Sequence, residues 1–294
     1  MMLVSAVITT HNREAGIVER AVKSVLNQTY PNIEIIVVDD SSLDYSYRAD
    51  VENSIRKMQE ASDSISIKYV EHETCRGACA ARNTGLGYCK GEIVGFLDDD
   101  DEWLPRKVEA MLPEFDAEDV ALVYCEAESF DESNNTVRVY NREKHKGKVF
   151  ESLIEDNYIG SASFPLMKRE AVIDAGGFDE ELQSSQDFDM WLRIAQKHNV
   201  SYVEDVLVRY HIHEGEQITK NPRKKIAGSE RLIEKNREYI DAHSQVYWIR
   251  HMKLIPHYLR IKEKKKAFGI WLKCVKKCPF RIKKNFTYLR LFFK

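Results

Sequence analysis

Four consecutive aspartates, Asp98 to Asp101, are the residues of this sequence whose type and spacing most clearly suggest chemistry. They follow an apolar segment, 93–97, that is typical of a buried strand. Adjacent carboxylates repel one another, and a divalent cation such as Mn²⁺ or Mg²⁺ would offset that repulsion because it prefers oxygen ligands. On an extended chain Asp98 and Asp100 point to the same side, so one can bind a metal while the other reaches a ribose or a water ligand. The alternative is a solvated acidic turn before a helix.

Further polar residues follow the ends of the first two predicted strands. Asp39 and Asp40 end the second strand, where a carboxylate can accept hydrogen bonds from a base N–H or a ribose hydroxyl. Thr9 ends the first strand and would form part of the opposite wall of a nucleotide site. Arg82 lies among small residues, 77–85, that allow close backbone approach, and its guanidinium could neutralise a diphosphate. The alternative for Asp39 and Asp40 is an ordinary Asp–Ser turn without a binding role. The alternative for Arg82 is a surface arginine on a packed helix.

Two further candidate sites, one at Asp187 and one at a pair of histidines, come later in the chain. Asp187 opens a predicted helix, about 187–198, at a position that the helix dipole favours for an acidic residue. Its carboxylate could also act as a general base that removes a proton from an acceptor hydroxyl. His211 and His213 alternate along the end of a predicted strand, so they face one side and could contact a metal or a phosphate. A merely polar strand end is the simpler alternative.

The elements that must position these residues alternate between strand and helix over the first hundred residues. Helical segments separate four apolar segments that predict strands, at 3–9, 33–38, 65–70 and 93–97. This alternation predicts an α/β protein with a Rossmann-like, mainly parallel sheet flanked by helices. Ligands of such sheets bind beyond the carboxyl ends of the strands. The polar residues at the strand ends are therefore expected along one edge.

Composition excludes a membrane-spanning or disordered chain. The 294 residues are 43% hydrophobic and 31% charged, as is usual for globular proteins. No apolar segment approaches the ~20 residues of a transmembrane helix. The N-terminus lacks the basic region and cleavage site of a signal peptide, so we expect a cytoplasmic protein with reduced cysteines.

The net charge of −3 conceals a basic C-terminal segment, 261–294, which we call the basic tail. It contains twelve Lys or Arg residues and one acidic residue, so its net charge is +11 and that of the remaining chain is −14. Seven aromatic residues are interleaved with these charges: Phe268, Trp271, Phe280, Phe286, Tyr288, Phe292 and Phe293. This pattern favours binding to an anionic membrane surface, peripherally on the inner face of the cell membrane.

Other interpretations of the basic tail remain open. It could be a helical appendage with a solvated basic face, or a contact in a homodimer. Nucleic-acid binding is not expected, because the rest of the chain is acidic.

Together these residues resemble family 2 of the nucleotide-sugar glycosyltransferases, whose fold is called GT-A. The resemblance covers about 3–219, and the order and spacing of the matching stretches make it specific. In chain order they are VITTHNR (7–13), VVDDSS (37–42), GACAARNTG (77–85), FLDDDDEW (96–103), GGFDEEL (176–182), QDFDMWLR (186–193) and YHIHEGEQIT (210–219).

The resemblance implies an organisation and a role for each matching residue. A GT-A domain would occupy 1–220, with a nucleotide-binding half at 1–103 and an acceptor-binding half at 104–220, and a helical C-terminal region would occupy 221–294. Asp98 and Asp100 would form the Asp-x-Asp metal and diphosphate motif. The nucleotide sugar would be held by Thr9, Asp39, Arg82, Asp98 and Asp99, and the divalent cation by Asp100 and His213.

The resemblance also implies a reaction. Asp187 would be the base of a single in-line displacement that inverts the anomeric configuration. The donor would be a nucleotide-diphosphate sugar, with UDP as the expected nucleotide, carrying a hexosyl or N-acetylhexosaminyl group. The acceptor would be a hydroxyl of a glycan or lipid-linked glycan in the synthesis of a surface polysaccharide.

Four positions depart from the family pattern. Gln186 replaces an acidic residue, Cys75 stands where asparagine is common, His11 where an aromatic is common, and His211 where arginine is common. A catalytically inactive nucleotide-sugar-binding regulatory module is one alternative, although the intact aspartates disfavour it. A sugar-phosphate nucleotidyltransferase is another, but it needs a glycine-rich, lysine-bearing loop where this chain has THNREAG.

Overall fold

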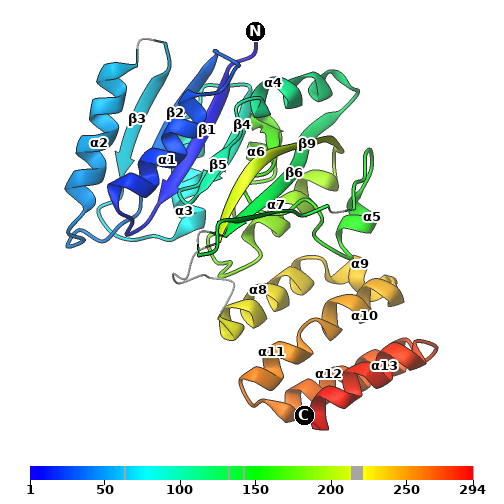
Figure 1. Ribbon diagram of the computed structural model, residues 1–294. Coiled ribbons are helices and arrows are strands. Elements are labelled where there is room, and N and C mark those ends of the chain that lie inside the picture. Colours follow the sequence, from blue (N-terminus) through cyan, green and yellow to red (C-terminus); the bar gives the residue numbers. More distant parts are fainter. Residues whose placement is uncertain (63, 132, 142, 213–220, 294) are drawn as a thin grey trace. The chain divides into compact units, whose positions relative to one another are not determined.

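The computed structural model describes residues 1–62, 64–131, 133–141, 143–212 and 221–293, and the predicted site residue His213 lies outside them. The chain forms two compact units, which are described separately (Figure 1). The first comprises Met1–Leu153, Asn157–Glu180 and Met190–Glu214. The second comprises Ile154–Asp156, Glu181–Asp189 and Gly215–Lys294.

The first unit begins with the alternation of strands and helices that the sequence predicts. Parallel pairing joins β2 to both β1 and β3, and β1 to β4. The strands are β1 (Val4–Thr10), β2 (Ile33–Asp39), β3 (Ser66–Glu71) and β4 (Ile93–Asp98). The intervening helices are α1 (Ala15–Leu26), α2 (Arg48–Ala61) and α3 (Ala78–Tyr88). The expectation of a parallel, Rossmann-like half is confirmed.

The rest of the sheet is mixed, and here the structure departs from a mainly parallel arrangement. The strand order is β3-β2-β1-β4-β8-β6-β9-β5, and β7 pairs with β6. The added strands are β5 (Asp101–Trp103), β6 (Val120–Asp131), β7 (Thr136–Val139), β8 (Leu166–Lys168) and β9 (Asn199–Ile212). β8 is antiparallel to both β4 and β6, and β5 is antiparallel to β9. Three-residue strands such as β5 and β8 carry too little periodicity to be recognised in a sequence.

Short helices connect these later strands. They are α4 (Lys107–Met111), the 3-10 helix η1 (Leu112–Asp116), α5 (Phe150–Leu153), α6 (Arg169–Asp174) and α7 (Gln186–Ala195). The last of these is the helix that the sequence predicts from about residue 187.

Two close approaches on β1 and β4 fix the framework of the site. A Cβ atom on Gly85 of α3 would lie 2.3 Å from Cγ1 of Val7, so the small residues of α3 do let this helix pack closely on β1. A Cβ atom on Gly95 of β4 would lie 2.6 Å from both the Trp103 ring and the Leu166 side chain. Trp103 itself is 1% exposed and belongs to the main apolar core. Strand β4, which leads into the acidic run, is thereby held tightly.

The second unit is helical, as expected for the C-terminal region. It contains α8 (Pro222–Lys235), α9 (Arg237–Ala242), α10 (Ser244–Met252), α11 (Ile255–Arg260), α12 (Lys264–Lys277), α13 (Ile282–Leu289) and the 3-10 helix η3 (Arg290–Phe293). A separate apolar core includes Trp248, Met252, Ile255, Ala267 and Cys274. Within the described residues, none of the helices has the length and apolar character that crossing a membrane requires.

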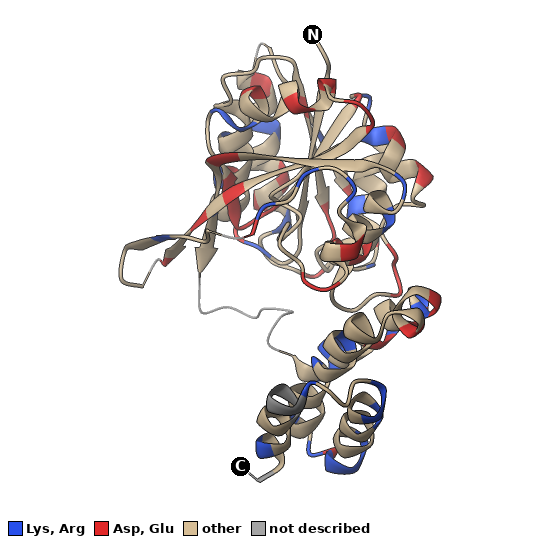
Figure 2. Cartoon of the chain, turned by 90° about the vertical axis from the view of Figure 1, so that its right-hand side faces the viewer, with Lys and Arg blue, Asp and Glu red and all other residues tan. Residues whose placement is uncertain are grey.

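The aromatic residues of the basic tail whose side chains the structure describes divide into two groups. Trp271, Tyr288 and Phe292 pack against the core of the second unit. Phe280 and Phe286 are 94% and 59% exposed, and Phe268 is also exposed. Figure 2 shows that Lys and Arg gather on these C-terminal helices. The tail is therefore a folded part of the unit that also presents basic and aromatic side chains to solvent.

Candidate functional site

The carboxyl ends of β1, β2 and β4 bring together polar residues that are far apart in the sequence. Thr9 lies opposite Asp98 in the parallel register, and β2 ends at Asp39. Asp39 is fully buried, and its carboxylate accepts hydrogen bonds from the backbone N–H of Ser41 at 2.8 Å and from the hydroxyl of Tyr69 at 2.7 Å. The expectation that these strand-end residues share one edge is confirmed.

Two arginines pair with the acidic run. Arg82 of α3 donates to Asp98 at 2.7 Å, and Arg13 donates to Asp99 at 3.1 Å and to Asp100 at 2.8 Å. The side chains of Asp98 and Asp100 are 28% and 21% exposed, whereas that of Asp99 is 8% exposed. The first and third carboxylates of the run are thus the accessible ones. Arg13 ends the VITTHNR stretch, which the sequence places in one wall of the nucleotide site, but its pairing with the acidic run was not predicted.

Burial and mutual repulsion affect the inner carboxylates. Burial is the main cause that raises the pKa of Asp99 to about 6, and the charge of Asp100 adds to it while Arg13 opposes it. Burial also raises the pKa of Asp101 well above its usual range. The hydroxyl of Ser163 donates to Asp101 at 2.5 Å and accepts from the backbone N–H of Asp98 at 3.1 Å. Repulsion between neighbouring carboxylates adds to burial in both pKa shifts, and a cation beside the run would relieve that repulsion.

The donor chemistry of this run fits a hard divalent cation. Asp98 and Asp100 offer accessible carboxylate oxygens, which Mn²⁺ and Mg²⁺ prefer over nitrogen or sulfur ligands. At the neighbouring β5–β9 pair, His211 is 4% exposed and lies 2.7 Å from Glu102 through Nε2. This contact between buried His211 and half-buried Glu102 accounts for His211 structurally.

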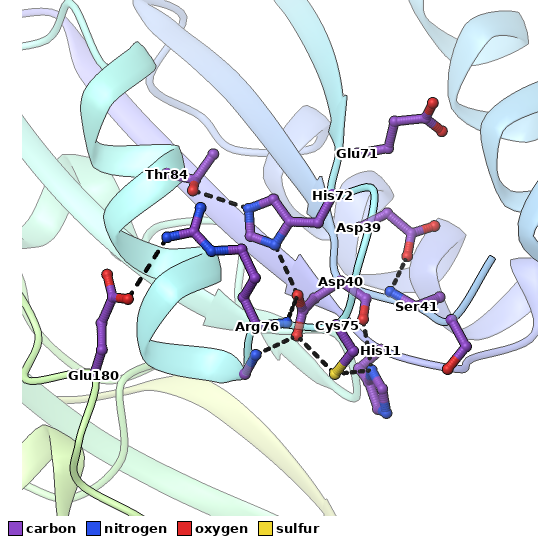
Figure 3. A network of polar contacts seen from close by, with 12 residues as sticks. His11, Asp39, Asp40, Ser41, Glu71, His72, Cys75, Arg76, Thr84 and Glu180 are labelled. Carbon is purple, nitrogen blue, oxygen red and sulfur yellow. Dashed lines mark hydrogen bonds and ion pairs between the residues drawn. The ribbon is translucent and has the colours of Figure 1, made fainter.

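Asp40, the second aspartate of its pair, is the centre of a polar network (Figure 3). It is 2% exposed and accepts hydrogen bonds from the backbone N–H groups of Arg76 and Gly77, each at 2.7 Å. Nδ1 of His72 lies 2.7 Å from the same carboxylate, and Sγ of Cys75 lies 3.4 Å from it. Asp40 therefore holds the loop before α3 against the end of β2, a role that sequence reasoning missed.

Hydrogen bonding decides the charge of Asp40. Burial by itself would raise the pKa of this carboxyl, but the donors from Arg76, His72 and Gly77 outweigh burial and lower it below the usual range. His72 also lies 2.9 Å from the hydroxyl of Thr84 through Nε2, which connects the network to α3. The helix that carries Arg82 is thus fixed to β2 by an ionised, buried aspartate.

The GGFDEEL stretch packs on the same helix. The side chain of Asn83 donates to the carbonyl of Phe178 at 2.8 Å and accepts from its backbone N–H at 2.7 Å. The guanidinium of Arg82 lies 5.3 Å from the centre of the Phe178 ring. Gly177 has φ +70°, and a Cβ atom on it would lie 2.7 Å from Asn83, so glycine is required there. This loop fixes the position of Arg82 beside Asp98.

Asp187 lies in the second unit, in the first turn of α7. It is partly exposed, whereas Asp189 is 1% exposed and bonds to Nζ of Lys235 at 2.6 Å. Asp189 therefore takes part in a buried structural ion pair. Asp187 is the one that solvent reaches more readily.

Comparison with known proteins identifies the family. The model of glycosyl transferase family 2 matches residues 5–176. WcaA of Escherichia coli K12, described as a colanic acid biosynthesis glycosyl transferase, is 30% identical over 255 residues, which are 83% of this chain and 85% of WcaA. WfgD of Escherichia coli, described as a UDP-Glc:alpha-D-GlcNAc-diphosphoundecaprenol beta-1,3-glucosyltransferase, is 30% identical over 68% of this chain and 73% of its own length.

Solved structures show the same fold. Residues 1–349 of S. aureus TarS, in complex with UDP-GlcNAc, match 92% of this chain and 90% of that chain with a TM-score of 0.62 and 17% identity. A longer TarS structure is matched over 50% of its length. The mannosyltransferase PcManGT from Pyrobaculum calidifontis, in complex with GDP-Man and Mn²⁺, matches with a TM-score of 0.61 and 19% identity, over 94% of this chain and 75% of that chain. The strand-end carboxylates and their arginines are thus carried on a GT-A fold, and the chain belongs to glycosyl transferase family 2.

Proposed function

We propose that this glycosyltransferase moves a hexosyl or N-acetylhexosaminyl group from a UDP-sugar to a hydroxyl of a glycan or lipid-linked glycan in surface polysaccharide synthesis. The family match supports transfer from a sugar donor. The descriptions of WcaA and WfgD support polysaccharide synthesis and a lipid-linked acceptor, and the TarS complex supports UDP as the nucleotide. In this proposal 1–103 binds the donor and 104–220 binds the acceptor.

The observation that carries the proposal is the acidic run with its two arginines at the strand ends. Thr9 and Asp39 are assigned to the nucleoside, and Asp98, Asp99 and Arg82 to the rest of the donor. Asp100 would hold Mn²⁺ or Mg²⁺ together with His213, and the bound cation would supply positive charge beside the leaving diphosphate. The PcManGT complex with GDP-Man and Mn²⁺ supports a cation in this fold.

The proposed reaction is a single displacement. The carboxylate of Asp187 takes the proton of the acceptor hydroxyl, whose oxygen attacks the anomeric carbon. The new C–O bond forms as the bond between that carbon and the diphosphate oxygen breaks, so the anomeric configuration inverts. In this proposal Arg82 opposes the negative charge that the diphosphate gains. The burial of its side chain, which is 7% exposed, and its packing against the Phe178 ring support this role.

The test is metal-dependent binding of UDP, measured by titration calorimetry. Asp100→Ala should abolish the Mn²⁺-dependent part of the affinity while the circular dichroism spectrum is retained. Asp44→Ala, a change of the same kind at an exposed position of the loop after β2, should bind as the unchanged protein does. Unchanged Mn²⁺-dependent affinity in Asp100→Ala would refute the assignment.

We also propose that the basic tail binds an anionic membrane surface. Phe280 and Phe286 are exposed next to a segment of high positive charge, and each basic residue near such a surface contributes ~1 kcal/mol. Phe280→Ser with Phe286→Ser should reduce sedimentation with phosphatidylserine vesicles at low salt. Val137→Ser with Val139→Ser, at exposed apolar positions of β7, should leave it unchanged. Failure of the unchanged protein to sediment would contradict the proposal.

A further inference from the structure

A second cluster of chemically reactive side chains lies beside the acidic run but is separate from it. In the part of the chain that the structure describes, His11, Asp40 and Cys75 are the one set of three His, Cys, Asp or Glu residues whose ligand atoms all lie within 4.8 Å of one another. Cys75 is the exposed member of the six cysteines, and the other five are buried. Figure 3 shows its sulfur between the imidazole and the carboxylate.

The distances within this cluster match the edges of a tetrahedral site. Zn²⁺ binds thiolate sulfur at about 2.3 Å and imidazole nitrogen or carboxylate oxygen at about 2.0–2.2 Å, so tetrahedral angles place sulfur about 3.5–3.7 Å from the other two ligand atoms. Sγ of Cys75 lies 3.8 Å from Nδ1 of His11 and 3.4 Å from Oδ2 of Asp40. Movements of a few tenths of an ångström would therefore bring these two pairs into coordination geometry.

The mixture of ligand types selects the metal. Sulfur, nitrogen and one carboxylate suit a borderline-soft cation such as Zn²⁺, whereas Mg²⁺ and Mn²⁺ prefer oxygen. We propose that His11, Asp40 and Cys75 form a binding site for a zinc-class divalent cation, distinct from the hard-cation site of the acidic run.

The surroundings of the cluster support this site. Asp40 is held in place by the backbone N–H groups of Arg76 and Gly77, as outer hydrogen bonds commonly orient metal-binding carboxylates. Binding replaces two existing contacts. The cation displaces the thiol proton of Cys75, which leaves to solvent. It also replaces the contact between Nδ1 of His11 and the carbonyl of Asp40, now 2.8 Å long. The Nδ1 proton leaves to solvent and Nε2 takes one up, so the neutral imidazole coordinates through Nδ1. Three protein ligands leave a fourth position for water.

The site would also affect the donor, and this consequence rests on the proposed function. His11 follows the end of β1, and Asp40 is the neighbour of Asp39, the residue assigned to the nucleoside. A cation held there would fix His11 and the loop at Cys75 next to the nucleoside. Zn²⁺ should therefore compete with UDP, whereas Mn²⁺ at the acidic run should promote its binding.

The first test is spectroscopic and needs no nucleotide. The reduced, metal-free full chain is titrated with Co²⁺ and Cd²⁺, whose thiolate charge-transfer bands report sulfur ligation, and Zn²⁺ affinity is measured by displacement of Co²⁺. The charge-transfer band should saturate at one thiolate-bound cation per chain. Cys75→Ser should abolish the charge-transfer band, and Cys75→Ser and His11→Phe should each lower Zn²⁺ affinity at least tenfold.

Cys89→Ser is the matched control, because Cys89 is buried and its thiol bonds to the carbonyl of Gly85, a bond that serine can also donate. It should keep the band and the affinity. Variants of Asp40 are avoided, since this residue anchors the loop and its loss affects folding. The proposal is overturned if the unchanged protein shows no one-to-one thiolate complex, or if Cys75→Ser retains it.

The second test measures UDP affinity with and without one equivalent of Zn²⁺. Competition that disappears in Cys75→Ser supports both the metal site and the placement of the nucleoside. A Cys75-dependent complex without competition keeps the metal site and contradicts only that placement.

Discussion

Replacing Asp40 with asparagine tests whether a buried carboxylate holds the loop before α3. Asparagine keeps the shape of the side chain but turns one acceptor oxygen into an NH₂ donor. One oxygen of Asp40 accepts from Arg76 N and the other from Gly77 N, each at 2.7 Å, so either orientation of the amide leaves one buried N–H facing a donor. That group costs about 1–3 kcal/mol, and the lost charge-assisted hydrogen bond adds about 1.5–3 kcal/mol.

The expected loss is therefore about 2.5–6 kcal/mol in the free energy of unfolding. Urea unfolding followed by tryptophan fluorescence measures it, since Trp103 is in the core of the same unit. Asp44→Asn, at an exposed position four residues on, should change the free energy by no more than about 0.5 kcal/mol. A loss below about 1 kcal/mol for Asp40→Asn would show that the network in Figure 3 does not carry this energy.

The same residue predicts a pH dependence. Hydrogen bonds lower the pKa of Asp40 in the folded protein despite its burial. An acid with a depressed folded pKa contributes stability that is present above its unfolded pKa of about 3.9 and is lost as the pH falls through the folded pKa. The stability difference between the unchanged protein and Asp40→Asn should therefore be largest near neutral pH and narrow below about pH 4. A difference that stays constant between pH 7 and pH 3.5 would contradict an ionised Asp40.

Further substitutions test the reaction and the framework. Asp187→Asn should lower sugar transfer roughly 10²–10⁴-fold while UDP affinity stays unchanged, and Asp174→Asn, at an exposed position, is the control. Full transfer activity in Asp187→Asn would exclude Asp187 as the base. If the unchanged protein binds the donor but transfers no sugar, the regulatory module is favoured instead. Gly95→Ala should destabilise the protein by about 1–3 kcal/mol, because its Cβ would meet the buried Trp103 ring. Gly87→Ala should instead stabilise α3 by up to about 1 kcal/mol, because a Cβ atom on Gly87 would meet no atom within 4 Å. Thermal unfolding measures both glycine variants, and a stability change of the same sign in the two would contradict this reasoning.

The sequence by itself determines the strand ends and the residues that follow them. Apolar segments alternate with helical ones over the first hundred residues, and parallel strands end at a common edge, so Thr9, Asp39 and Asp98 could be placed together. The small residues of α3 likewise indicate its close packing on β1. These properties are local, because each depends on residue types within one short segment and on the general geometry of α/β sheets.

Only the tertiary structure decides which partner each polar residue has. Arg13 reaches carboxylates 86 and 87 residues away, and Asp40 bonds to backbone N–H groups 36 and 37 residues away, contacts that no spacing in the sequence specifies. The cluster of His11, Asp40 and Cys75 arises for the same reason, since two connections, one from His11 to Asp40 and one from Asp40 to Cys75, bring these residues to one point. Hydrogen bonds and metal sites depend on distances of tenths of an ångström, and the packing of β1, β2 and α3 as a whole sets those distances.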